Sequence, residues 1–125
     1  MGDFLEIYAF YFKTGTTNAG VYSIKFTGTT GVLLGGGSGA ASDVRAILRT
    51  TCVVTAVGSS GSLWCDMGWQ HNSSLVPNSN TAAVNTTINN AIVFDGSLGS
   101  GPSDTLTLEH FKIVLTKNAN LTVAP

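Results

Sequence analysis

The segment Phe4–Phe12 carries apolar side chains at eight of its nine positions, with Glu6 as its one charge. Successive side chains of a β-strand point to opposite faces, so a strand with one face in water alternates apolar and polar residues, which this segment does not do. We therefore expect one face to pack on the chain's own core and the other on a second sheet or another subunit. The candidate subunit-interface residues here are Phe4, Tyr8, Phe10 and Phe12.

Further along the chain, runs of β-favouring residues are separated by clusters of Gly, Ser, Asn and Thr, which are typical of turns. The strands predicted in this way are Phe4–Lys13, Val21–Thr27, Val44–Val57, Ser62–His71, Val84–Phe94 and Thr105–Thr116. Short strands with turns at this spacing are typical of sandwiches and barrels. We expect an all-β, antiparallel, jelly-roll-like β-sandwich in which residues 1–125 form a single domain.

Two of these strands have a face pattern that predicts local geometry. In Val21–Thr27 every second residue is apolar, so one side of the strand faces the core and the other faces water. In Thr105–Thr116 the apolar parity changes between Leu108 and Phe111, and a bulge near Glu109 and His110 accounts for that change.

Two segments also fit a helix, and a glycine-rich segment fits a nucleotide site. For Val84–Ile92 we favour a strand, whereas a short helix over Ala41–Arg49 stays open as an alternative. Directly before Ala41, Gly35-x-Gly37-x-x-Ala40 has the spacing of a dinucleotide-binding turn, but no acidic residue follows at the distance of about 20 residues that such a site needs. We favour a flexible Gly/Ser loop and expect no cofactor.

The charge pattern limits the classes of partner. Charged residues make up 10% of the chain, against roughly 25% in ordinary domains, and its six Lys and Arg residues do not cluster. Nucleic-acid binding needs a basic surface, so we expect no nucleic-acid partner. No apolar run approaches the ~20 residues that span a bilayer, and we expect neither a signal peptide nor membrane insertion.

No motif predicts an enzyme. Gly36–Ala40 lacks the closing glycine of a nucleophile elbow, and neither His71 nor His110 has an assigned nucleophile or orienting acid. Both histidines are expected on strands near polar edges. The two cysteines lack the spacing of a metal site, so we expect no bound metal. We also expect no catalytic residue.

Cys52 and Cys65 form a candidate cross-strand pair. If Gly58 and Ser59 are the two central residues of a hairpin turn, counting outward sets Cys52 opposite Cys65. Cross-strand spacing permits a disulfide there, but a cytosol-made protein ordinarily keeps its thiols reduced. We expect reduced thiols, with the disulfide as the alternative.

The two tryptophans fall on opposite faces of Ser62–His71. Trp69 shares its face with Leu63, Cys65 and Met67 and is expected in the core. Trp64 shares the other face with polar residues, so it is expected either at the subunit interface or as a platform on which a sugar stacks. We favour the interface and add Trp64 to its candidate residues.

Three motifs in order are Gly2–Ile7 (GDFLEI), Val21–Phe26 (VYSIKF) and Asp104–Glu109 (DTLTLE). Their order resembles the jelly-roll domains of tailed-bacteriophage virion proteins, over roughly residues 2 to 116. The chain starts at the second strand of that pattern, without the usual first edge strand. The resemblance therefore implies either a fragment or a sheet that a neighbouring chain completes.

Such domains occur as trimeric head-decoration or cement proteins and as tips of head and tail fibres, without enzymatic activity. The resemblance thus implies a non-enzymatic virion structural protein, with capsid decoration as the leading role. It implies a homotrimer that contacts the major capsid protein or another virion protein, at the virion surface after synthesis in the host cytoplasm. A glycan-binding fibre tip and a small lectin-like module remain alternatives, and a β-sandwich hydrolase is the least favoured.

Overall fold

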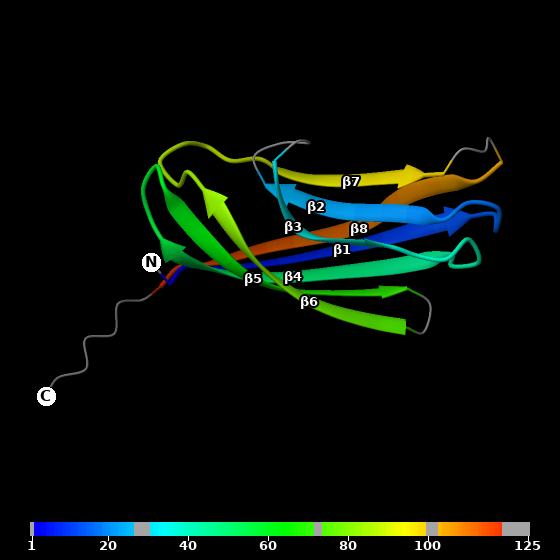
Figure 1. Cartoon of the computed structure of the whole chain (residues 1–125), viewed down its shortest axis with the longest axis horizontal. Helices are drawn as coiled ribbons and strands as arrows, with labels where there is room; N and C mark the ends of the chain where they lie inside the picture. The colour runs from blue at the N-terminus through cyan, green and yellow to red at the C-terminus, as the bar shows by residue number, and fades with distance from the viewer. Residues whose placement is uncertain (1, 27–30, 72–73, 100–102, 119–125) are drawn as a thin grey trace, which may run out of the picture.

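The computed structural model describes residues 2–26, 31–71, 74–99 and 103–118, with the side chains of residues 74–78 excepted. These residues form eight strands and no helix (Figure 1). The strands are β1 (Phe4–Thr14), β2 (Gly20–Phe26), β3 (Val32–Ser38), β4 (Arg45–Ala56), β5 (Gly61–His71), β6 (Ser74–Val84), β7 (Ile92–Leu98) and β8 (Thr105–Thr116).

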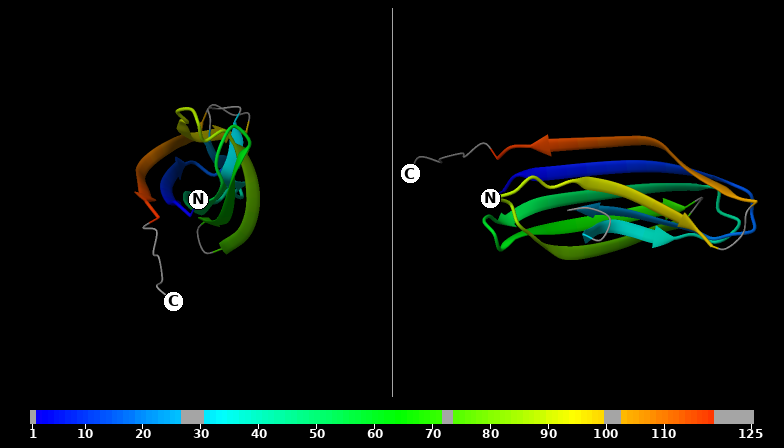
Figure 2. Two further views of the ribbon diagram at one scale, coloured as in Figure 1. Left: turned by 90° about the vertical axis from the view of Figure 1, so that its left-hand side faces the viewer. Right: turned by 90° about the horizontal axis from the view of Figure 1, so that it is seen from above.

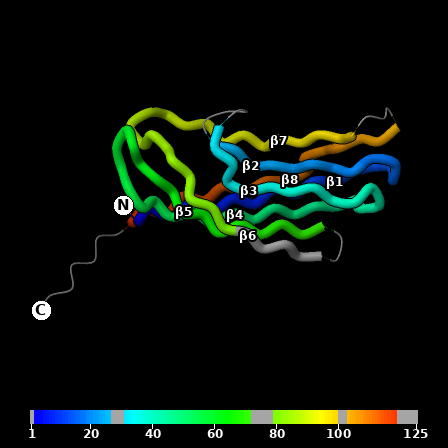
Figure 3. The backbone as a smooth tube through the Cα atoms, in the orientation of Figure 1, coloured from blue at the N-terminus to red at the C-terminus, as the bar shows by residue number. Residues whose placement is uncertain are grey.

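The strands form two antiparallel sheets that pack face to face. The larger sheet has the order β6-β5-β4-β1-β8 and the smaller has the order β3-β2-β7. The end-on view in Figure 2 shows the two sheets curving around a common interior, and the trace in Figure 3 shows the chain crossing between them. The all-β prediction is confirmed, and the packing of the two sheets is that of a β-sandwich.

The core lies between the sheets and is built from alternate residues of each strand. On β2, Tyr22 and Ile24 are buried and Phe26 packs beside them, as the alternation of that strand predicts. Trp69 is 7% exposed and lies in the core as expected. The other buried apolar residues are Leu5, Ile7, Ala9, Tyr11, Leu34, Ala46, Leu48, Cys52, Leu63, Cys65, Met67, Ala82 and Val84.

β1 is paired on both sides, with β4 along one edge and with β8 along the other. It is therefore not an open edge of the large sheet. The β1–β8 register shifts opposite Phe10 and Tyr11, where His110 is followed in the pairing by Leu108. Glu109 is the extra residue, which confirms the predicted bulge and puts Leu108 on the same face as Phe111 and Ile113.

The glycine-rich segment is a strand rather than the expected flexible loop. β3 pairs with β2 from Val32 to Ser38, and its glycines have no positive φ. A Cβ at Gly36 would lie 2.5 Å from the Tyr22 carbonyl oxygen, and a Cβ at Gly35 would overlap the Thr50 hydroxyl. These glycines allow a close approach of backbone to backbone and of sheet to sheet, and they form no strand-to-helix turn of the dinucleotide-binding kind.

Two further expectations about the strands are wrong. The predicted strand Val84–Phe94 is the end of β6, a connection, and the start of β7, while most of β6 was not predicted at all. The open helix alternative over Ala41–Arg49 is also wrong, because β4 begins at Arg45. Pairing with neighbouring strands outweighs the local helix preference there.

The hairpin between β4 and β5 has the predicted cysteine register but a different turn. The Gly61 amide donates to the Gly58 carbonyl at 3.1 Å, so Ser59 and Ser60 are the central residues. A register shift beside Ala56 then compensates for the different turn, so that Cys52 still pairs with Cys65.

Cys52 and Cys65 are directly paired across β4 and β5, and their Cα atoms are 4.1 Å apart. The structure joins their Sγ atoms in a disulfide, so the expectation of reduced thiols is wrong. The pairing brings the two side chains together in the core, where both are fully buried.

Candidate functional site, an exposed sheet face

The outer face of the five-stranded sheet carries large apolar side chains that the smaller sheet does not cover. On β1 the residues that alternate with the buried Leu5, Ile7, Ala9 and Tyr11 point to this face. Phe4 is 38% exposed and Tyr8 is 37% exposed, while Phe10 and Phe12 are half-buried. The four predicted interface residues of β1 therefore share one face.

Trp64 lies on the same face. Phe4 pairs with Val53 of β4, and Val53 in turn pairs with Trp64 of β5. Trp64 alternates with the buried Leu63 and Cys65 and is 49% exposed. The structure thus brings all five predicted interface residues to one side of one sheet, and their role at an interface remains a prediction.

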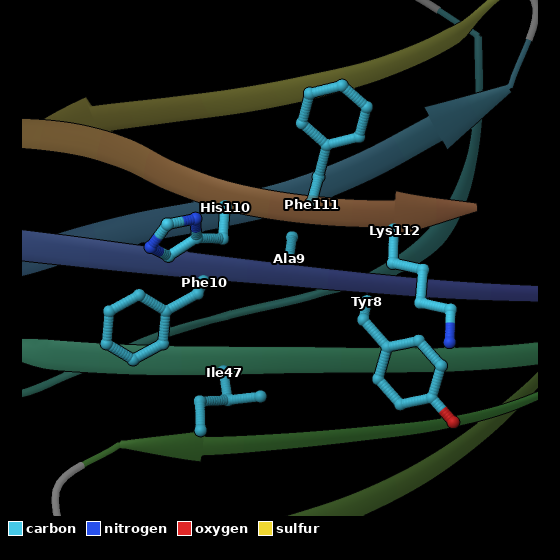
Figure 4. Close-up of a pocket in the computed structure, with 7 residues that line it drawn as sticks. All are labelled: Tyr8, Ala9, Phe10, Ile47, His110, Phe111 and Lys112. Atoms are coloured by element: carbon cyan, nitrogen blue, oxygen red, sulfur yellow. The ribbon is translucent and has the colours of Figure 1, made fainter.

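A shallow groove crosses this face between β4, β1 and β8 (Figure 4). Its volume is about 240 Å³, and the side chains of Tyr8, Phe10 and Ile47 lie along it with His110 and Lys112 at its β8 side. The Phe10 and His110 rings lie 6.3 Å apart. Phe111 points away from the others in Figure 4, toward Phe94 of β7, with the two ring centroids 5.0 Å apart.

A second hollow, of about 310 Å³, lies at the end of the sandwich near the start of β1 and the end of β8. Its walls are almost entirely apolar, and Leu115 at its side is 55% exposed. Asn90 borders it, and the Oδ1 atom of that side chain is buried without a hydrogen-bond partner. The remaining lining residues are Leu5, Phe26, Val54, Leu63, Val84, Thr86, Ile92 and Ile113.

The two histidines lie apart from each other on strands. The His71 Nδ1 atom bonds the Asp43 carboxylate, and its ring stacks on Trp69 with centroids 4.5 Å apart. His110 lies on the outer face beside Phe10. No nucleophilic side chain is bonded to either ring in the contacts that the structure describes, so a His-based nucleophile pair is not assembled at these positions.

A buried ion pair escaped the sequence analysis. The Lys13 side chain is fully buried, and its Nζ donates to the carbonyls of Gly15 at 2.6 Å and Ala41 at 2.8 Å. It also lies 3.5 Å from Asp104 Oδ2. Lys13 occupies one of the alternate positions of β1 that are buried. A lysine at such a position was the one signal in the sequence that could have revealed the ion pair with Asp104.

Asp104, immediately before β8, is the acidic residue of the same cluster. Its Oδ2 accepts the backbone amides of Asn18 at 2.7 Å and Thr17 at 3.0 Å. The Asn18 amide, together with the nearby Lys13 ammonium and the Thr17 amide, lowers the pKa of this carboxyl below its usual value. The arrangement anchors the β1–β2 connection to β8 and offers no open position to a ligand, so we read it as structural.

Within the described residues, no group of three or more His, Cys, Asp and Glu side chains is placed to hold a metal ion. The same residues contain no helix with the length and apolarity to cross a bilayer.

Comparison of the chain with protein-family models, with curated proteins and with solved structures finds no match. The proposal that follows therefore rests on the outer face of the five-stranded sheet and on the motifs quoted above.

Proposed function

We propose that this chain is a non-enzymatic structural protein of a bacteriophage virion that assembles through the outer face of its five-stranded sheet. Exposed Phe4, Tyr8 and Trp64 on one face are the observation that carries this proposal. Large apolar side chains exposed together on one sheet face favour an interaction surface, because monomeric soluble proteins rarely expose large apolar patches. Aromatic and arginine side chains are also the residues most enriched in protein interfaces.

The virion assignment is supported by the placement of the motifs behind the resemblance. The GDFLEI motif enters β1 and the DTLTLE motif enters β8, and these strands pair along their length in the large sheet. The proposal includes a jelly-roll-like variant of the sandwich and a place at the virion surface. Disulfides persist in such exposed settings, so the Cys52–Cys65 bridge is compatible with that location.

The leading role within this class is capsid decoration, with the major capsid protein or another virion protein as the partner. A test uses heads of the phage that encodes the chain, assembled without this gene, mixed with the purified protein. We expect co-sedimentation with the heads and a higher temperature of head disruption. Absence of binding to heads, with binding to whole cells instead, would remove the decoration role.

The alternative role is a glycan-binding fibre tip, and Trp64 is the observation that favours it. This indole is 49% exposed, and its neighbours on the same face include the exposed Asp66 on β5 and Thr81 on β6. An exposed ring beside polar groups is a surface on which a sugar can stack. Glycan-array binding that is lost in Trp64→Ala, with oligomer mass unchanged, would support the fibre tip against the decoration protein.

A further inference from the structure

The strand register sorts the outer face of the five-stranded sheet into rows that run across the strands. The last row, toward the end of β1, is Thr107, Phe12 and Arg45, and four rows precede it along β1. The first apolar row is Phe4, Val53 and Trp64, and the acidic row is Glu6, Thr51 and Asp66. The basic row is Lys112, Tyr8 and Arg49, and the second apolar row is His110, Phe10 and Ile47. Along the strands these four rows follow the order apolar, acidic, basic, apolar, with Val114 of β8 also in the acidic row and Gln70 of β5 also in the second apolar row.

This order is symmetric in hydrophobicity and opposite in charge about its centre. A two-fold rotation about an axis that lies parallel to the sheet, and perpendicular to its strands, reverses the order of the rows. If that axis passes between the acidic and basic rows, each acidic row faces a basic row and each apolar row faces an apolar row. The pattern is complementary to a copy of itself.

We propose that the outer face binds a second copy of this chain, face to face, through this two-fold axis. Each copy then contributes the same patch, as an isologous interface requires. The inference rests on the self-association in the proposed function, and it specifies that the assembling unit is a dimer rather than the trimer implied by the resemblance.

The apolar pairs on β1 and β4 that this rotation brings together are compatible in size and chemistry, while Trp64 on β5 faces Gln70 of the second copy. Because the axis crosses the strands, each strand faces its own copy, and Phe4 faces Phe10 of the second copy. Val53 faces Ile47 of the second copy in the same way. The groove beside Phe10 in Figure 4 lies where Phe4 of the second copy enters.

The charged rows interlock between strands. Thr51 and Arg49 share β4, so the rotation sets Arg49 of the second copy above Thr51, between Glu6 on β1 and Asp66 on β5. The rotation sets Gly68 of the second copy opposite Asp66, and a glycine has no side chain to obstruct this contact. Charge complementarity of this kind fixes the register of an interface.

The same side chains are available for a partner. Arg49, Asp66 and Lys112 are exposed, and Glu6 is half-buried. None of these four forms an ion pair within the described part of the chain, whose ion pairs are Lys13–Asp104, Lys25–Asp95, His71–Asp43 and Lys117–Asp3. Among the described residues, no close ionic contact neutralises their charges.

The other two-fold arrangement of the two faces is disfavoured. An axis parallel to the strands leaves every row opposite itself, so the acidic row of Glu6 and Asp66 faces the same acidic row of the second copy, and the basic row faces the same basic row. Like charges placed together at an interface strongly oppose association. The strands of two packed sheets cross at an angle of roughly 30°. The rows of the two copies are therefore aligned best near the two-fold axis.

The test uses two charge-reversal variants and light scattering. In Arg49→Glu/Lys112→Glu the basic row becomes acidic, and in Glu6→Lys/Asp66→Lys the acidic row becomes basic. The wild-type chain is expected to have the mass of two chains, and each variant alone the mass of one. An equimolar mixture of the two variants is expected to recover the mass of two chains, because the acidic rows of one then face the basic rows of the other.

The control variant Lys25→Glu/Lys117→Glu changes the net charge by the same amount as Arg49→Glu/Lys112→Glu but lies outside the outer face, and it is expected to remain a dimer. A wild-type trimer overturns this inference and leaves the proposed virion role standing. A wild-type monomer over the concentration range overturns both. A dimer whose mass is unchanged in either row variant overturns the inference alone, and recovery in the mixture shows that both variants fold.

Discussion

Gly37 on β3 lies against the indole ring of Trp69 on β5, so closely that a methyl group at Gly37 would overlap the ring. The two residues belong to different sheets, and their contact fixes how closely those sheets approach. Trp69 is also packed against the rings of Tyr22 and His71. The indole therefore has little room in which to move away from a larger residue.

We predict that Gly37→Ala destabilises the fold by about 1–3 kcal/mol, the usual cost of overpacking a core. The matched control is Gly99→Ala, where the nearest atom to the new methyl group would be 3.5 Å away, an ordinary contact. Urea unfolding followed by tryptophan fluorescence gives both free energies of unfolding. Equal losses in the two variants would show that the Trp69 contact does not limit the sheet spacing.

The disulfide makes a second prediction, on stability. Closing a loop of about 15 residues removes roughly 3 kcal/mol of chain entropy from the unfolded state, and Cys52 and Cys65 are 13 residues apart. The Cys52→Ala/Cys65→Ala variant is expected to lose about that much in urea unfolding. Thiol titration of the unfolded wild type without reductant checks the bond itself, since two reactive thiols would contradict it.

Tyr11 makes a third prediction, for alkaline pH. Burial, with the nearby Asp95 charge as a smaller cause, raises the pKa of Tyr11 to about 12. In the unfolded chain this phenol ionises near 10, so its contribution to stability is complete below pH 10 and is lost as pH rises through the folded value.

The measurement for Tyr11 is unfolding free energy against pH, for the wild type and for Tyr11→Phe. The variant loses the hydrogen bond to the Asp95 carbonyl, which costs about 0.5–1.5 kcal/mol at neutral pH. It is also expected to show a shallower decline above pH 10. An identical decline in both proteins would mean that Tyr11 does not carry this dependence.

Asp104 makes a fourth prediction, for acidic pH. Its pKa is lowered in the folded protein, so its contribution to stability is present above the ordinary value of 3.8 and is lost as pH falls through the folded value. Asp104→Asn is expected to be less stable at neutral pH and to lose less on acidification than the wild type. The control is Glu109→Gln, an exposed carboxylate on the same strand, for which we expect little change at neutral pH.

Face patterns on single strands were readable from the sequence because burial imposes a period of two. The solvent-facing side of β2 and the bulge at Glu109 both follow from which residues are apolar. The alternation also assigned Trp64 to the face of its strand opposite Trp69, whereas the face that it shares with Phe4 and Tyr8 follows from the strand pairing. What the alternation could not provide was the register between strands, and the charged rows exist only in that register.

The two missed strands lack the residues on which strand prediction depends. Three successive glycines in β3 carry no side chain, so their strand character follows from close packing against Tyr22, Thr50 and Trp69. β6 contains Pro77, which pairs opposite Gly68 at the sheet edge, where a proline is tolerated. Both strands are specified by their neighbours rather than by their own propensity.

The two tryptophans provide the last prediction, which separates the surface role from the core role. Trp69→Ala removes a buried indole and is expected to cost about 3–5 kcal/mol of unfolding free energy. Trp64→Ala alters an exposed side chain, so the unfolding free energy of the monomer is expected to change by about 0.5 kcal/mol or less. If Trp64 is an anchor of the interface, the same change weakens self-association by about 2 kcal/mol, or about 30-fold.

Light scattering across a dilution series measures the association, and urea unfolding below the dissociation concentration measures the monomer. Trp64→Ala is expected to alter the association constant and not the unfolding free energy of the monomer. If Trp64→Ala leaves the association constant unchanged, Trp64 is not part of the subunit interface. Its exposed ring then fits the glycan-binding alternative better than the decoration role, because a surface indole with no protein partner remains free to stack on a sugar.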